Sequence, residues 1–199
     1  MTTLADFPLT HAGKLSSLLI AKRVVSFYEA INYLATLPYC QLAHPQDLTT
    51  VISQAGGTFT ARNAFLAQLA HEQGIAELSL TLCVQKFDGE TYPEVNRILA
   101  RYGLSDLPDM NGCLKYQGRL YTVAEGSLSV RCEVLSEVEI APVQIGTFKR
   151  RYHQKYLENW LQMEGLSGKW SVAQVWHIYQ KCLRAIEAHW KNHRRPVAV

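Results

Sequence analysis

The spacing of hydrophobic residues changes several times along the chain, and each change predicts a different kind of element. From Leu15 to Leu37, apolar residues recur every three or four positions, which predicts one amphipathic helix. A second helix is predicted over residues 61–73, with Thr58 or Thr60 as its N-cap and Gly74 at its end. The first half of the chain is therefore predicted to be helical.

Between residues 78 and 140 the apolar period becomes two, which is typical of strands. Two amphipathic helices then follow, over about residues 143–163 and 171–191. Helices, then antiparallel strands, then helices predict an α+β fold. We expect a leader over 1–14, one domain over 15–191 and a basic tail over 192–199. The predicted strands are 78–84, 113–117, 119–123 and 131–140, the second and third joined tightly at Gly118.

Composition narrows the class of protein. The chain has 199 residues, of which 48% are hydrophobic and 19% charged, as expected of a soluble globular domain. The apolar run Leu18–Ala21 is too short for a signal peptide or a membrane span. Five scattered cysteines without a Cys-x-x-Cys pair indicate reduced thiols and no structural zinc site. We expect a cytoplasmic protein without a metal or cofactor and without membrane attachment.

Charge is distributed unevenly. Residues 148–199 carry ten Lys and Arg against three Asp and Glu, a net charge of +7, which leaves −4 for residues 1–147. A basic patch can attract nucleic acid. No aromatic-interleaved basic strand or nucleic-acid motif accompanies the charge, so the pattern favours solvated helix faces over nucleic-acid binding.

The segment Gly56–Phe65 reads as a glycine turn that leads into a helix, where unpaired N–H groups would stabilise a thiolate. It resembles the nucleophile turn Gly-Thr-Cys-Ser-x-Lys-His-Ala of bacterial transglutaminase-like proteins. Thr58 and Ala64 match that pattern, and Phe59 stands at the cysteine position.

The resemblance extends over about residues 27–187. Pro108–Tyr116 is similar to the family's Pro-Glu-Ala-His-Cys-Tyr-Leu-Lys strand, with Asn111 at the position of the catalytic histidine. Gly118–Thr122 resembles the next strand, where Tyr121 or Thr122 replaces the orienting aspartate. The C-terminal region follows the family pattern at Glu139–Gly146, Lys149, His153 and Trp160, and more loosely at Trp176–Cys182, where Tyr179 and Gln180 replace an Arg-Glu pair.

The resemblance implies a papain-like core, a helix packed on an antiparallel sheet, with two C-terminal helices. Active relatives would use a Cys-His-Asp triad for acyl transfer or amide hydrolysis. None of the three groups is retained here, so we expect a catalytically inactive domain that binds a peptide or protein. Thr58, Phe59, Asn111 and Tyr121 are the expected lining of the former cleft. Phe59 can equally be a core aromatic, which burial energy favours.

Two alternatives stay open. One is a thiol-dependent hydrolase or acyltransferase with a relocated cysteine, Cys113 or Cys83, although neither has a credible histidine partner in the sequence. The other is a scaffold protein that acts through its basic C-terminal helices.

Overall fold

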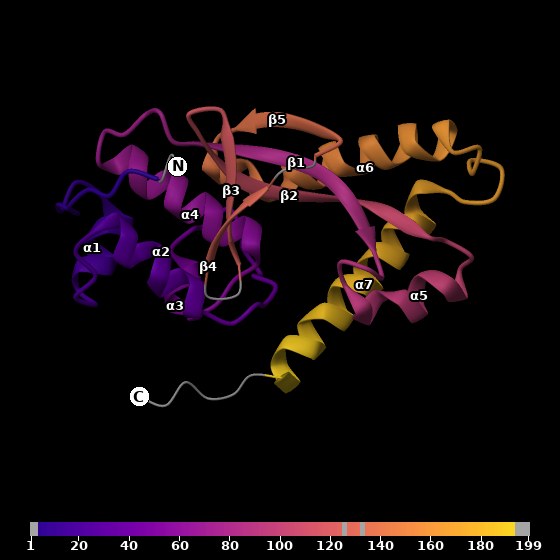
Figure 1. Ribbon diagram of the computed structural model, residues 1–199, viewed down its shortest axis with the longest axis horizontal. Helices are drawn as coiled ribbons and strands as arrows, with labels where there is room; N and C mark the ends of the chain where they lie inside the picture. The colour runs from indigo at the N-terminus through magenta and orange to yellow at the C-terminus, as the bar shows by residue number, and fades with distance from the viewer. Residues whose placement is uncertain (1–3, 125–126, 132–133, 194–199) are drawn as a thin grey trace.

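The computed structural model describes residues 4–124, 127–131 and 134–193 and confirms an α+β fold (Figure 1). Its five-stranded antiparallel sheet has the order β4-β3-β2-β1-β5. The strands are β1 (Ser79–Asp88), β2 (Asp106–Tyr116), β3 (Arg119–Ala124), β4 (Ser127–Arg131) and β5 (Ser136–Ile140). The helices are α1 (Lys14–Ile20), α2 (Phe27–Thr36), α3 (Thr50–Ser53), α4 (Phe59–Glu72), α5 (Asn96–Arg101), α6 (Thr147–Met163) and α7 (Val172–His193), with short 3-10 helices at Pro93–Val95 and Pro142–Ile145.

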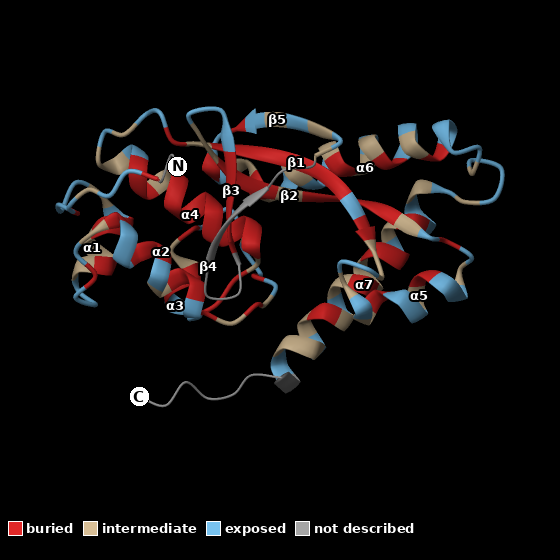
Figure 2. Ribbon diagram, viewed as in Figure 1, coloured by how far each residue is buried: buried red, intermediate tan, exposed pale blue. Residues whose placement is uncertain are grey.

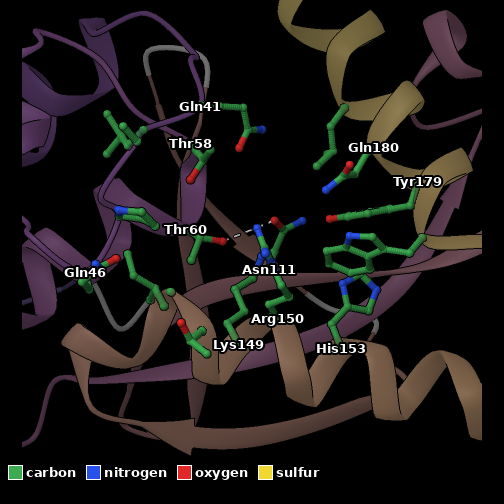
Figure 3. A pocket seen from close by; sticks show the side chains of 18 of the residues that line it. Gln41, Gln46, Thr58, Thr60, Asn111, Lys149, Arg150, His153, Tyr179 and Gln180 are labelled. Atoms are coloured by element: carbon green, nitrogen blue, oxygen red, sulfur yellow. Dashed lines mark hydrogen bonds between the residues drawn. The ribbon is translucent and has the colours of Figure 1, made fainter. Parts of the chain in front are cut away.

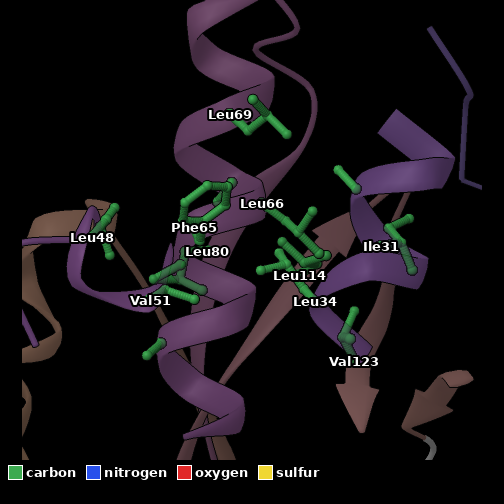
Figure 4. Packing of buried hydrophobic residues seen from close by; sticks show 14 of the residues in the cluster. Ile31, Leu34, Leu48, Val51, Phe65, Leu66, Leu69, Leu80, Leu114 and Val123 are labelled. Carbon is green, nitrogen blue, oxygen red and sulfur yellow. The ribbon is translucent and has the colours of Figure 1, made fainter. Parts of the chain in front are cut away.

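Helix α4 is the centre of the first hydrophobic cluster. It is buried along almost its whole length, as are the central strands β1 and β2 (Figure 2). Such a helix needs apolar side chains on most of its faces, because every face meets protein. Burying one Leu or Phe side chain contributes about 1.5–3 kcal/mol. The cluster joins Phe65, Leu66 and Leu69 of α4 to Ile31 and Leu34 of α2, Leu48, Val51, Leu80, Leu114 and Val123 (Figure 4).

A second hydrophobic cluster lies around the C-terminal helices. Leu157 of α6 and Val175 and Ile178 of α7 are almost fully buried there. Phe87 and Leu107, from the paired ends of β1 and β2, complete the cluster. The long ladder between these two strands therefore supports both clusters.

Two sequence-based elements were wrong. The predicted single helix from Leu15 to Leu37 is two helices, because Arg23 adopts a left-handed φ of 65° after α1 and Ser26 caps the start of α2. The predicted strand 131–140 is also divided. Arg131 ends β4 on one edge of the sheet, whereas Ser136–Ile140 form β5 on the other edge, and residues 132–133 lie outside the described residues.

The segment predicted as a leader is attached to the domain. Leu4 and Leu9 are buried in the first cluster. The Leu9 N–H donates to the Val25 carbonyl at 2.8 Å, and Pro8 forms a bridge with Ser26. Residues 4–13 therefore belong to the folded unit. Of the predicted tail, residues 194–199 lie outside the described part of the chain.

The tight turn predicted at Gly118 is confirmed. Gln117 and Gly118 both have positive φ, 47° and 75°, which is the geometry of a two-residue hairpin turn that matches strand twist. As for membrane insertion, none of the helices within the described ranges combines the length and apolar character needed to cross a bilayer.

Strands β2 and β3 pair only near their shared turn, and Asn63 of α4 bridges them where they separate. Its amide nitrogen donates to the Gly112 carbonyl at 2.8 Å and to the Thr122 hydroxyl at 3.0 Å. Its amide oxygen accepts from the Val123 N–H at 3.0 Å. One fully buried side chain thus satisfies backbone groups on both strands.

Replacing Asn63 with Ala should lower the free energy of unfolding by about 2–4 kcal/mol, because buried polar groups on both strands lose their partners. Chemical denaturation monitored by circular dichroism measures the loss. Gln68→Ala is the matched control on the same helix, because Gln68 is only half-buried, and it should change stability by less than about 0.5 kcal/mol. A loss below about 1 kcal/mol for Asn63→Ala would show that the bridge is not stabilising.

Candidate functional site

A cavity of about 380 Å³ opens where the N-terminus of α4 meets β2 and the two C-terminal helices (Figure 3). A loop over residues 39–46 forms one wall, and α6 and α7 form the others. Its polar lining includes Gln41, Gln46, Thr58, Thr60, Asn111, Thr147, Lys149, Arg150, His153, Tyr179 and Gln180. The cavity therefore lies between the two hydrophobic clusters.

The first turn of α4 is held to β2 by two threonines. Thr58 caps the helix, because its hydroxyl accepts from the Ala61 N–H at 3.2 Å. The Thr60 hydroxyl accepts from the Gly112 N–H at 2.9 Å. Gly112 permits this approach, since a Cβ atom there would lie 2.9 Å from Cγ2 of Thr60.

A buried carboxylate orients Asn111. Asp109, on the same strand, is 3% exposed and accepts from the Asn111 amide nitrogen at 2.5 Å. Its other oxygen accepts from the Tyr179 hydroxyl at 2.6 Å. Burial, and then the charge of Asp109, raises the pKa of Tyr179, which keeps that phenol protonated as the donor. The Asn111 amide oxygen is left facing the Thr60 hydroxyl, 3.5 Å away.

His153 lines the cavity as a neutral imidazole. Its Nε2 atom lies 2.9 Å from the Pro108 carbonyl oxygen, which can only accept, so Nε2 carries the proton. Burial, followed by the positive charge of Lys149, lowers the pKa of His153 to about 4. A histidine of that pKa is a weak base at neutral pH.

Two cations, Lys149 and Arg150, reach the same space from the first turns of α6. Burial lowers the pKa of the Lys149 ammonium, and the Asp109 carboxylate partly opposes that effect. Neither cation makes an ion pair or a hydrogen bond within the part of the chain that the structure describes.

The four predicted cleft residues separate into two pairs. Thr58 and Asn111 line the cavity, whereas Phe59 and Tyr121 are not among its lining residues. Tyr121 is 2% exposed and belongs to the first hydrophobic cluster, because strand alternation turns it toward the core beneath α4. The expectation that all four line one cleft is therefore corrected for these two aromatic residues.

Phe59 is a core aromatic residue and not a cleft-lining one. The sequence had allowed both interpretations. Phe59 is 8% exposed, and its ring centroid lies 5.1 Å from that of Tyr39 and 6.2 Å from that of Trp190. The guanidinium of Arg62 lies 5.5 Å from the ring centroid and donates to the Leu37 carbonyl at 2.7 Å. The ring thus joins the start of α4 to the end of α7.

The two candidate cysteines are buried away from this cavity. Cys83 and Cys113 are each 1% exposed and pack with Leu120 in a third, small cluster. A hydrogen bond with the Cys113 sulfur, followed by burial, holds the pKa of Cys83 far above its usual range. Neither thiol is among the lining residues, and a protonated buried thiol is a poor nucleophile.

The cationic side of the cavity was not predicted from the sequence. Lys149 and His153 are four residues apart and therefore share one face of α6, a signal that the sequence did contain. Their meeting with Thr60 and Asn111 depends on tertiary packing. Among the described residues, no group of three His, Cys, Asp or Glu side chains is placed to hold a metal ion.

Comparison with known proteins finds no match to this chain, whether among protein-family models, curated proteins or solved structures. The arrangement itself defines an α+β domain with a polar, cation-bearing cavity at the N-terminus of its central helix.

The buried neutral His153 should make stability depend on pH. Its folded-state pKa of about 4 lies below the usual value of 6.5, so between these pH values the unfolded chain binds more protons. Stability from this residue is complete above pH 6.5 and is lost as pH falls toward 4, by about 3 kcal/mol in total. His153→Gln should abolish that part of the pH profile of unfolding. Parallel profiles for the two proteins would contradict the assignment.

Truncating Phe59 to Ala should reduce stability by about 3 kcal/mol, because it leaves a cavity between Tyr39 and Trp190. Thermal and denaturant unfolding measure the effect. Phe148→Ala is the control, since Phe148 is 41% exposed, and it should cost less than half as much. Equal effects of the two substitutions would show that Phe59 is not a packing residue.

Proposed function

We propose that this protein is a non-catalytic binding domain whose cavity at the N-terminus of α4 holds a segment of a peptide or protein. The observation that carries the proposal is the chemistry of the site. Thr58 and Thr60 at the helix start and Asn111 on β2 can exchange hydrogen bonds, but none is an ionisable nucleophile or base near neutral pH. The resemblance to transglutaminase-like proteins supports the same proposal, as a member whose triad positions carry Phe59, Asn111 and a non-carboxylate.

The lining suits a peptide backbone. Side-chain amides of Gln41, Gln46 and Gln180 and hydroxyls of Thr58 and Thr147 both donate and accept hydrogen bonds. An extended peptide presents alternating N–H and C=O groups that need such partners. A volume of about 380 Å³ lies within the range of about 300–1,000 Å³ that is usual for ligand sites.

The alternative of a relocated thiol finds no support in the geometry. Catalysis needs a thiolate beside a base, and Cys83 is held protonated outside the cavity lining. The scaffold alternative would use the exposed basic faces of α6 and α7, since Leu157 and Val175 place the inner faces of these helices in the core. A reducing compartment, the cytoplasm, is part of the proposal, since Cys83 and Cys182 are buried thiols outside any disulfide.

Blocking the cavity tests the proposal. A capped peptide library is titrated into the full chain, and binding is followed by NMR shifts of the Thr58, Thr60 and Asn111 amides. Gln180→Trp places a large ring in the cavity and should weaken binding by roughly tenfold or more, which corresponds to about 1.4 kcal/mol. His177→Trp is the control, because His177 is exposed on the same helix and does not line the cavity.

Retained peptide binding in Gln180→Trp would place the peptide elsewhere and contradict the proposed site. Amide hydrolysis or amine incorporation by the unmodified chain would contradict the non-catalytic assignment. A loss of stability in Gln180→Trp is distinguished from blocked binding by comparing unfolding curves of the two tryptophan variants.

A further inference from the structure

The charged groups that line the cavity are all basic. Lys149 and Arg150 contribute two cations, and no Asp or Glu is among the lining residues. In Figure 3 both side chains extend from α6 toward Asn111 and the threonines of α4. Arg150 is exposed and Lys149 is half-buried, and two like charges on one wall raise the local potential.

These cations are not used by the fold. Lys149 has no ion-pair or hydrogen-bond partner among the described residues, and neither has Arg150. Some other cations of the domain do have such partners: Lys115 pairs with Glu137, and Lys181 donates to the Tyr102 hydroxyl. A partly buried ammonium without a directly bonded counter-charge is unfavourable, and burial lowers the pKa of Lys149 although the Asp109 carboxylate opposes that effect.

The charge balance favours a monoanion. Asp109 lies close enough to influence Lys149, but its two oxygens already accept from Asn111 and Tyr179. Lys149, Arg150 and Asp109 together carry a net charge of +1, and His153 is neutral at pH 7 because its pKa is about 4. A carboxylate balances this charge, whereas a dianionic phosphate would exceed it.

We infer that Lys149 and Arg150 form a carboxylate seat within the cavity and that the bound segment is an acidic peptide. This inference rests on the proposed function and specifies its ligand. The Lys149 ammonium and the Arg150 guanidinium both line the cavity, and a guanidinium can bind the two oxygens of a carboxylate side by side. Thr58 and Thr60 supply hydroxyl groups on the opposite wall, beside the N-terminus of α4.

Asn111 adds no positive charge to the cavity. Asp109 holds its amide nitrogen, and its amide oxygen faces the Thr60 hydroxyl. The balancing charge for a bound anion therefore comes from Lys149 and Arg150.

Two capped tripeptides, acetyl-Ala-Glu-Ala-amide and acetyl-Ala-Gln-Ala-amide, test the inference on the full chain, with inorganic phosphate as a third probe. Amide NMR shifts of Thr58, Thr60 and Asn111 report binding at the cavity. The Glu peptide should bind roughly tenfold or more tightly than the Gln peptide, because its carboxylate forms charge-assisted hydrogen bonds that the neutral Gln amide does not form. Higher salt should weaken the Glu peptide most.

Lys149→Gln and Arg150→Gln should each remove most of the Glu preference, which is the ratio of the affinities for the Glu and Gln peptides. Arg151→Gln is the control of equal charge change, because Arg151 is exposed on α6 and does not line the cavity. An equal loss of the Glu preference in Arg151→Gln would show that the preference comes from the general positive charge of α6. That result would overturn the carboxylate seat.

The remaining outcomes separate this inference from the proposed function. Equal binding of the two peptides at the cavity overturns the carboxylate seat and leaves peptide binding standing. Tighter binding of phosphate than of the Glu peptide overturns the choice of a carboxylate. Absence of any shift at the cavity with all three probes overturns both.

Discussion

The rest of the structure depends on the hydrogen bonds that join the first turns of α4 to β2 and β3. These bonds lie at the point where the two strands separate. The Thr60 hydroxyl accepts from the Gly112 N–H. The Asn63 side chain donates to the Gly112 carbonyl and accepts from the Val123 N–H. The helix thus satisfies backbone groups that β2 and β3 do not pair with each other. Unpaired backbone groups at that depth would each cost about 1–3 kcal/mol. The helix start is thus fixed in position and orientation, and the cavity lies directly beside it.

The second constraint is the length of the ladder between β1 and β2. One part of it packs under α4, and its paired ends at Phe87 and Leu107 reach α7. Between these parts, Asp109 accepts from Tyr179 and joins the strand to the C-terminal helix. The cavity forms at this junction because neither cluster extends across it. Its walls come from segments more than one hundred residues apart, and residues that line the cavity, such as Thr60 and Tyr179, take part in the contacts that hold them.

Local signals in the sequence predicted the elements better than their assembly. The capped helix at Thr58 and the turn at Gly118 carry strong local signals, and both are present. The break near Arg23 has no glycine or proline to announce it, and the polar start of β2 hides its pairing with β1. Thr58 and Asn111 were expected at the site from the family resemblance, and Thr58 also from its place at the helix start. Lys149 and Arg150 stood out as part of a charge run, but their place in the cavity could not be predicted, because only the fold brings α6 to α4.

Phe59 packs at the start of α4, whereas Lys149 and Arg150 of α6 line the cavity beside the same helix start. The Phe59 ring packs on Tyr39 and Trp190 and so adds cohesion between α4 and α7, which a small nucleophilic side chain would not. This packing is linked to the cavity through Tyr39, which contacts the Phe59 ring and lines the cavity, although Phe59 itself does not. Burial lowers the pKa of Lys149, and the Asp109 carboxylate only partly opposes that effect, so an anion bound in the cavity would add a second counter-charge and offset the cost of burying the ammonium.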